Sequence, residues 1–148
     1  MTGFRDKINL LVDLLMNKKF CVSSQNRYQL IDITPQVEKI VVESKVDNGL
    51  CLVFVPHSTA AVILTESEEG LKNDWLAVLK RLVSGFAFLH DRIDNNADSH
   101  ILSGLLGQGK TLAIEKGKLI RGTWQQIFLV ELDGPRKRSV IVALSRSH

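Results

Sequence analysis

The chain has 148 residues, 45% of them hydrophobic, and a formal net charge of +3 at pH 7. This length predicts one domain with a real core, and no apolar run reaches the roughly 18 residues that span a bilayer, so no membrane association is expected. Two cysteines, Cys21 and Cys51, are too few for a disulfide framework and favour a reducing, cytoplasmic compartment. The mild charge is not a nucleic-acid signature, so nucleic acid is not an expected partner.

The first 18 residues are predicted to form an amphipathic helix that precedes a single domain, residues 19–148. Apolar side chains recur in this segment at helical spacing, at Phe4, Ile8, Leu11 and Leu15. No small-residue cleavage site follows, so the segment is not a signal peptide. We expect it to pack on the domain or on a neighbouring subunit.

The rest of the chain alternates between predicted strands and helices. A helix is expected after Thr34, a good N-cap, with Pro35 in its first turn. A second helix is expected after Ser67, with a buried stripe at Leu71, Trp75, Val78, Leu79 and Leu82. A third, short helix should open at Asp98 or Ser99.

Strands are expected at 20–22, 28–33, 50–55 and 60–65, and then as a four-strand meander in TLAIE, KLIRGTW, IFLVEL and VIVALS. This order is not the regular alternation of a doubly wound sheet. The predicted class is α+β: a mostly antiparallel, β-sandwich-like sheet with a few flanking helices.

The stretch VPHSTAAVILTE, residues 55–66, breaks a strand-like run at its most buried-looking point. The apolar run ends at Pro56, and His57, Ser58 and Thr59 follow where a plain core would carry valines. Either these side chains satisfy a turn, or they bind something. Hydroxyls and successive backbone N–H groups in a turn suit a phosphate.

A second polar stretch, HDRIDNNADSH, is bracketed by His90 and His100. His90 and His100, folded together with His57, would suit zinc or a similar ion, although their spacing matches no compact metal motif. The alternative is that each imidazole makes a separate hydrogen bond.

A third stretch, RGTWQQIFLVELDGPRKRS, places Glu131 inside an apolar strand. The side chain is either exposed on one face of the sheet or buried with a partner, and burial would make it a candidate for an elevated pKa and acid–base work. The basic cluster at residues 134–139 is either a solvated hairpin tip or a contact for a phosphate or a carboxylate.

Together the three stretches resemble the conserved blocks of the YjbQ family, in the family's order and at about its spacing. The resemblance covers most of the chain from about Cys21 onwards. It implies a YjbQ-like α+β fold, a homotrimer, and a thiamine-phosphate-synthase-like activity that joins hydroxymethylpyrimidine pyrophosphate to thiazole phosphate and releases pyrophosphate.

The resemblance also implies which residues carry the chemistry. Those expected to be catalytic are His57, His90, Asp98, His100 and Glu131, and the three histidines are the expected ligands of a divalent metal, zinc or magnesium. Those expected to bind the phosphorylated substrate are Ser58, Thr59, Glu66, Asn95, Asn96, Trp124 and Gln125. Two alternatives stay open: a non-catalytic trimer that binds a phosphometabolite or a metal, and a metal-assisted phosphatase.

Overall fold

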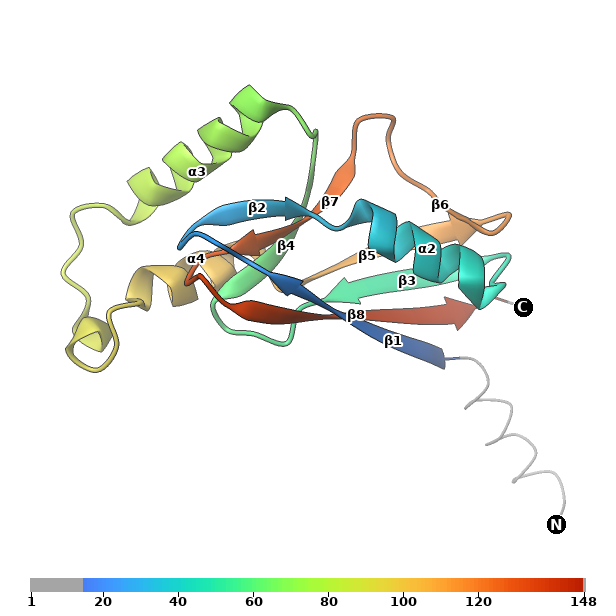
Figure 1. Ribbon diagram of the computed structural model, residues 1–148, viewed down its shortest axis with the longest axis horizontal. Coiled ribbons are helices and arrows are strands. Elements are labelled where there is room, and N and C mark those ends of the chain that lie inside the picture. Colours follow the sequence, from blue (N-terminus) through green and yellow to red (C-terminus); the bar gives the residue numbers. More distant parts are fainter. Residues whose placement is uncertain (1–14, 148) are drawn as a thin grey trace, which may run out of the picture.

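The computed structural model describes residues 15–147. Two antiparallel sheets face each other (Figure 1). The five-stranded sheet has the order β1 (Leu15–Ser23), β8 (Lys137–Arg146), β3 (Gly49–Phe54), β5 (Gly109–Glu115) and β6 (Lys118–Leu119). The three-stranded sheet has the order β2 (Gln29–Asp32), β7 (Gln126–Glu131) and β4 (Ala60–Thr65).

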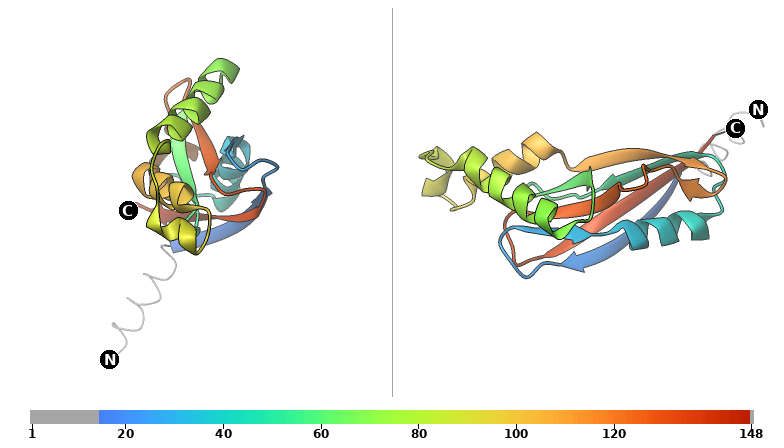
Figure 2. Two further views of the ribbon diagram at one scale, coloured as in Figure 1. Left: turned by 90° about the vertical axis from the view of Figure 1, so that its left-hand side faces the viewer. Right: turned by 90° about the horizontal axis from the view of Figure 1, so that it is seen from above.

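The helices complete the layers. They are α2 (Thr34–Ser44), α3 (Glu69–Val83), the 3-10 turn η1 (Leu89–Arg92) and α4 (Ala97–Leu106). α3 and α4 cover the outer face of the three-stranded sheet, where Leu79 and Leu102 pack with Phe128 of β7. α2 lies toward the other end of the molecule (Figures 1 and 2). The predicted α+β class and the sandwich-like sheet are confirmed.

The main core lies between the two sheets, and the strand patterns follow from it. On β3, Cys51 and Val53 point inward and are fully buried, whereas Leu50, Leu52 and Phe54 are 37–52% exposed on the outer face. β7 is buried on both faces because α3 and α4 cover its outer side, and it therefore reads as a continuous apolar run.

The predicted four-strand meander is wrong. β7 pairs with β2 and β4 in the three-stranded sheet, whereas β5, β6 and β8 belong to the other sheet. Of KLIRGTW only Lys118–Leu119 is a strand. Short apolar runs reveal strands, but their partners depend on contacts that are distant in the sequence.

The predicted helix starts also need correction. Ile33, not Thr34, precedes α2, and the Thr34 hydroxyl accepts the Ile127 amide at 2.8 Å instead of capping the helix. α3 is capped by Glu68, whose carboxylate accepts the amides of Gly70 and Leu71 at 2.8 and 2.7 Å. Asn96, rather than Asp98 or Ser99, precedes α4.

The predicted buried stripe of α3 is only partly correct. Leu79 is buried, but Val78 and Leu82 are more than half exposed. The expected N-terminal helix lies mostly on residues 1–14, outside the described residues, and Leu15–Lys18 belong to β1 instead. Between residues 15 and 147, no helix combines the length and apolar character that crossing a membrane requires.

At Gly49 the backbone of β3 passes close to that of β8. A Cβ at this position would lie 1.8 Å from the carbonyl oxygen of Ser145. Gly49→Ala is therefore expected to lower the free energy of unfolding by about 2–3 kcal/mol, because the strand backbones must separate. The matched control is Gly104→Ala in α4, where a Cβ meets nothing within 4 Å. It should stabilise the helix by up to about 1 kcal/mol.

Urea unfolding of the two glycine variants measures both changes. Equal stability of the two would show that the β3–β8 approach is not tight.

Candidate functional site

The polar residues meet at one end of the sandwich, beside two of the connections that join the sheets. Residues 55–59 lead from β3 to β4, and residues 132–136 lead from β7 to β8. Ala60 pairs with Glu131, so the two crossings lie side by side. The start of α4 adjoins them, because the Ser99 hydroxyl donates to the carbonyl of Leu132 at 2.5 Å. Figure 1 shows α4 and η1 at this end.

A cavity of about 320 Å³ opens here. Its lining residues are Pro56, His57, Ser58, Thr59, Asn96, His100, Asp133, Arg136 and Arg138. Five of these residues were expected at the site from the sequence: His57, Ser58, Thr59, Asn96 and His100. The polar interruption after β3 thus lines a cavity at the end of the sandwich.

Beneath the cavity lies a buried ion pair between Glu131 and Arg138. Glu131 is fully buried and Arg138 is 4% exposed. Arg138 Nε donates to Glu131 Oε2 at 2.8 Å, and its Nη2 donates to Oε1 at 2.5 Å. The same Nη2 donates to the carbonyl and the hydroxyl of Thr59, at 3.2 and 2.9 Å. Thr59 and Glu131 therefore fix the guanidinium in one orientation at the cavity.

The expectation that burial would elevate the pKa of Glu131 is wrong in this environment. Burial by itself would raise the pKa of the carboxyl. Hydrogen bonds from Arg138, from the Asp133 amide and from the Ser24 hydroxyl outweigh burial, and the pKa lies below its ordinary value. Glu131 is therefore an ionised counter-charge rather than a proton donor near neutral pH.

His57 is held in one tautomer. Its Nε2 accepts the backbone N–H of Ser139 at 2.9 Å, so the proton of the neutral ring sits on Nδ1. Burial, together with the nearby Arg138 charge, lowers the pKa of His57. The ring therefore stays neutral near pH 7 and offers one N–H donor.

On the other side of the cavity, hydrogen bonds link η1 to the β7–β8 crossing. His90 Nε2 contacts Asn96 Oδ1 at 3.1 Å, and Asn96 Nδ2 donates to Asp133 Oδ2, also at 3.1 Å. Arg136 Nη2 donates to the same carboxylate oxygen at 2.9 Å. The His90 and His100 rings meet edge to face, with centroids 5.0 Å apart, but only His100 lines the cavity.

The three histidines do not form the ligand set expected for zinc or magnesium. Nε2 of His57 is occupied by the Ser139 amide, and His90 lies outside the cavity lining. Within the part of the chain that the structure describes, no group of three or more His, Cys, Asp or Glu side chains is placed to hold a metal ion.

Asp98 and Asn95 contact the β1–β2 connection instead of the cavity. Asp98 Oδ1 accepts Arg27 Nη2 at 2.9 Å, and its Oδ2 accepts the hydroxyl of Tyr28. The carbonyl of Asn95 accepts the same Arg27 nitrogen at 3.0 Å. Asp98 therefore ties α4 to this connection and, although it was expected to be catalytic, is not part of the cavity lining.

Three expected substrate-binding residues lie next to the ends of β4 and β7 that are remote from the cavity: Glu66, Trp124 and Gln125. Thr65 pairs with Gln126, five positions from the Ala60–Glu131 pair, which corresponds to roughly 17 Å along the sheet. Trp124 is 70% exposed, and the Gln125 side chain accepts the Gly122 amide at 2.8 Å. The structure does not bring these three residues to the cavity.

Four residues at the site were not singled out by any sequence pattern: Ser24, Asp133, Arg136 and Arg138. The basic cluster at residues 134–139 was the signal, and its anion-contact alternative pointed to this surface. Alternation along β8 separates its first two residues, because Arg138 points inward like Val140 while Lys137 is exposed.

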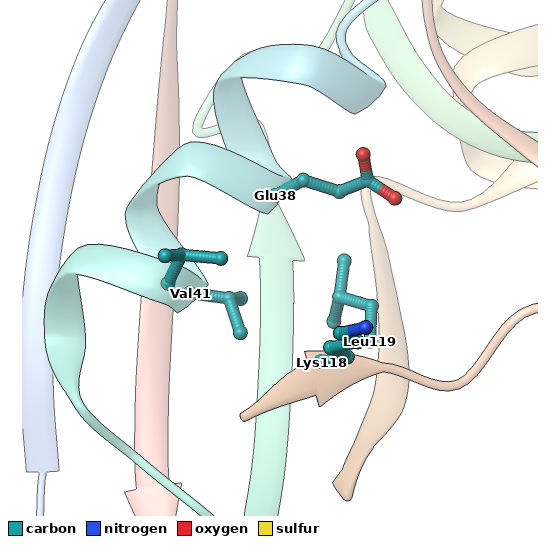
Figure 3. Close-up of a pocket in the computed structure, with 5 residues that line it drawn as sticks. Glu38, Val41, Lys118 and Leu119 are labelled. Atoms are coloured by element: carbon teal, nitrogen blue, oxygen red, sulfur yellow. The ribbon is translucent and has the colours of Figure 1, made fainter. Parts of the chain in front are cut away.

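A second hollow, of about 270 Å³, lies between α2 and β6 (Figure 3). Val41, Val42 and Leu119 give it apolar walls, and Glu38 and Lys118 add one charge of each sign. It contains none of the residues expected at the site. The polar cavity at the end of the sandwich is therefore the candidate site.

Comparison with known proteins finds relatives that share one family description, UPF0047. The sequence pattern described as "UPF0047 protein YjbQ-like" matches residues 18–147. A UPF0047 protein of Archaeoglobus fulgidus is 47% identical over 122 residues, which is 82% of this chain and 94% of that protein. A UPF0047 protein of Methanocaldococcus jannaschii is 38% identical over 128 residues, 85% of this chain and 91% of the relative.

Solved structures agree with the fold. The crystal structure of a YbjQ-like protein of unknown function from Sulfolobus solfataricus superposes with a TM-score of 0.88 at 43% identity, covering 90% of this chain and 98% of that one. A hypothetical protein from Aeropyrum pernix superposes with a TM-score of 0.86 at 34% identity, covering 89% and 99%. The chain belongs to the UPF0047 (YjbQ-like) family.

Proposed function

We propose that the protein is a thiamine-phosphate-synthase-like transferase whose leaving pyrophosphate occupies the polar cavity at the end of the sandwich. The observation that carries the proposal is the gathering of Arg136, Arg138, His57, His100 and Ser58 around one polar cavity. Cationic and N–H donors in fixed positions are what a departing pyrophosphate needs.

The chemistry matches the groups present. The bond between the pyrimidine methylene carbon and the pyrophosphate oxygen breaks, and its electron pair leaves with the pyrophosphate. The lone pair of the thiazole nitrogen forms the new carbon–nitrogen bond. No proton leaves carbon in this exchange, so the reaction requires donors to the leaving group more than a general base. An ionised Glu131 that holds Arg138 in place is consistent with that requirement.

The test is thiamine phosphate formation by the pure full-length protein. Hydroxymethylpyrimidine pyrophosphate and thiazole phosphate are supplied with and without added divalent metal, and the product is quantified by chromatography. Wild type should form product, and His57→Ala and His100→Ala should each lose roughly tenfold or more of the rate because each removes a group from the cavity.

Lys39→Met is the control, since it removes a positive charge from the exposed face of α2. There Lys39 Nζ lies 3.8 Å from Glu43 Oε1. This variant should form thiamine phosphate at the wild-type rate. Folded wild-type protein that forms no product would contradict the proposal. Full activity in both histidine variants would move the reaction away from the cavity.

A further inference from the structure

Some hydrogen-bond donors at the cavity have no protein partner within residues 15–147, and they indicate which kind of ligand the cavity binds. Arg138 contributes a charged side chain that is almost completely buried and lines the cavity. Its Nε and Nη2 are engaged by Glu131 and Thr59. Among residues 15–147, Nη1 donates no hydrogen bond to the protein. A buried guanidinium with a free nitrogen beside a polar cavity is a ready donor for an oxyanion.

His57 supplies a second donor whose position is fixed. The Ser139 amide occupies Nε2, so only Nδ1–H is available, and within the described chain it has no protein partner. Ser139 follows Arg138 directly on β8. The same strand therefore sets the tautomer of His57 and carries the guanidinium.

The cavity is close to neutral before a ligand enters. Glu131 balances Arg138, and Asp133 balances Arg136, whose Nε and Nη2 donate to the Asp133 carbonyl and carboxylate at 2.7 and 2.9 Å. Recognition of an anion must therefore rest on the directed donors more than on excess positive charge. Phosphate oxygens, which accept several hydrogen bonds at once, suit such a site.

A metal bridge is a poor alternative for these same atoms. Nδ1 of His57 could ligate a metal only if its proton moved to Nε2, where it would point at the Ser139 N–H. Glu131 and Asp133 already accept hydrogen bonds from arginines, and no three-ligand group is present in residues 15–147.

We propose that the cavity binds a phosphate or pyrophosphate group directly, without a bridging metal, through Arg138 Nη1 and His57 Nδ1–H, with Glu131 and Ser139 as positioning residues. The inference deepens the proposed function and rests on it for the identity of the molecule that carries the phosphate.

The test titrates inorganic pyrophosphate into the full-length protein by calorimetry, after metals have been removed on a chelating resin. Wild type should bind saturably. His57→Gln keeps an acceptor near the position of Nε2 but lacks the Nδ1 donor, so its affinity should fall by roughly tenfold or more. His57→Asn carries an amide near the position of Nδ1 and should keep most of the affinity.

Two further variants separate the buried cation from general charge. Lys137→Met removes an exposed positive charge from the same segment and should change the affinity by no more than about twofold. The double variant E131Q/R138M removes the ion pair while leaving no unpaired buried charge, and its folded form should lose roughly tenfold or more of the affinity.

Three results would overturn the inference: binding that requires added zinc or magnesium, wild-type affinity in His57→Gln, or wild-type affinity in the folded double variant. Metal-free binding by a protein that forms no thiamine phosphate would keep this inference and reject the proposed function. If wild type forms thiamine phosphate but His57→Gln and the double variant bind pyrophosphate with unchanged affinity, the proposed function is kept and this inference is rejected.

Discussion

Arg138→Met is expected to lower the free energy of unfolding by about 3–5 kcal/mol, among the largest effects of any single substitution in this domain. The variant leaves the fully buried Glu131 carboxylate without its guanidinium partner. Urea unfolding followed by far-UV circular dichroism measures the change at pH 7.

The double variant E131Q/R138M is the control for this effect. It replaces both charges with neutral groups of similar size, and such replacements of a buried pair are often close to neutral. It should recover most of the stability that Arg138→Met loses. If the two variants were equally unstable, packing around Arg138 rather than the unpaired charge would account for the loss.

The second large effect is acid destabilisation centred on the same end of the sandwich. The pKa of Glu131 is lowered as described above. The pKa of Asp133 is also lowered: burial would raise it, but hydrogen bonds from Asn96 and Arg136 outweigh burial. The pKa of Asp98 is lowered in the same way by Tyr28, the Ser99 amide and Arg27. Three carboxylates that link separate elements are therefore held ionised by the fold.

The sign of the pH dependence follows from these directions. A carboxyl whose pKa is lower in the folded state than in the unfolded chain, about 3.9 for Asp and 4.3 for Glu, contributes stability that is complete above about pH 5. That contribution is lost as the pH falls through the folded-state pKa. The free energy of unfolding should therefore be steady near neutral pH and fall steeply below about pH 4.

Urea unfolding between pH 7 and pH 3 checks this dependence, and Glu131→Gln sharpens it. The stability difference between wild type and this variant should shrink toward low pH, because wild-type Glu131 becomes protonated and resembles glutamine. A repeat at high salt screens repulsion between surface charges and affects the buried pair less. A difference that stayed constant or grew toward acid would show that the Glu131 charge is not the cause.

The sequence was informative wherever one feature of the chain decides the outcome locally. The break at Pro56, followed by His57, Ser58 and Thr59, indicated a site because apolar strands do not carry such groups without a reason. Five of the nine lining residues of the cavity were expected from these patterns and from the family resemblance. Strand positions and the α+β class could be read in the same way, because side-chain alternation reflects burial on one face.

The tertiary structure decided which polar side chains come together at the cavity. Asp98 and His100 are two residues apart on α4, yet one contacts Arg27 and the other lines the cavity, because successive helix positions point in different directions. Glu66 and Trp124 lie in blocks that also contribute cavity residues, but at the far ends of β4 and β7.

Arg138 shows the same division between sequence and structure most clearly. By composition it is one cation in a basic cluster, and its sequence neighbour Lys137 is exposed. Only the pairing of β4 with β7, and the return of the chain into β8, places Arg138 between Glu131 and Thr59. The sequence by itself determined the fold class, the polar break after β3 and the histidines near it; the tertiary structure alone chose the buried cation and the tautomer of His57, because both depend on partners about 80 residues away in the chain.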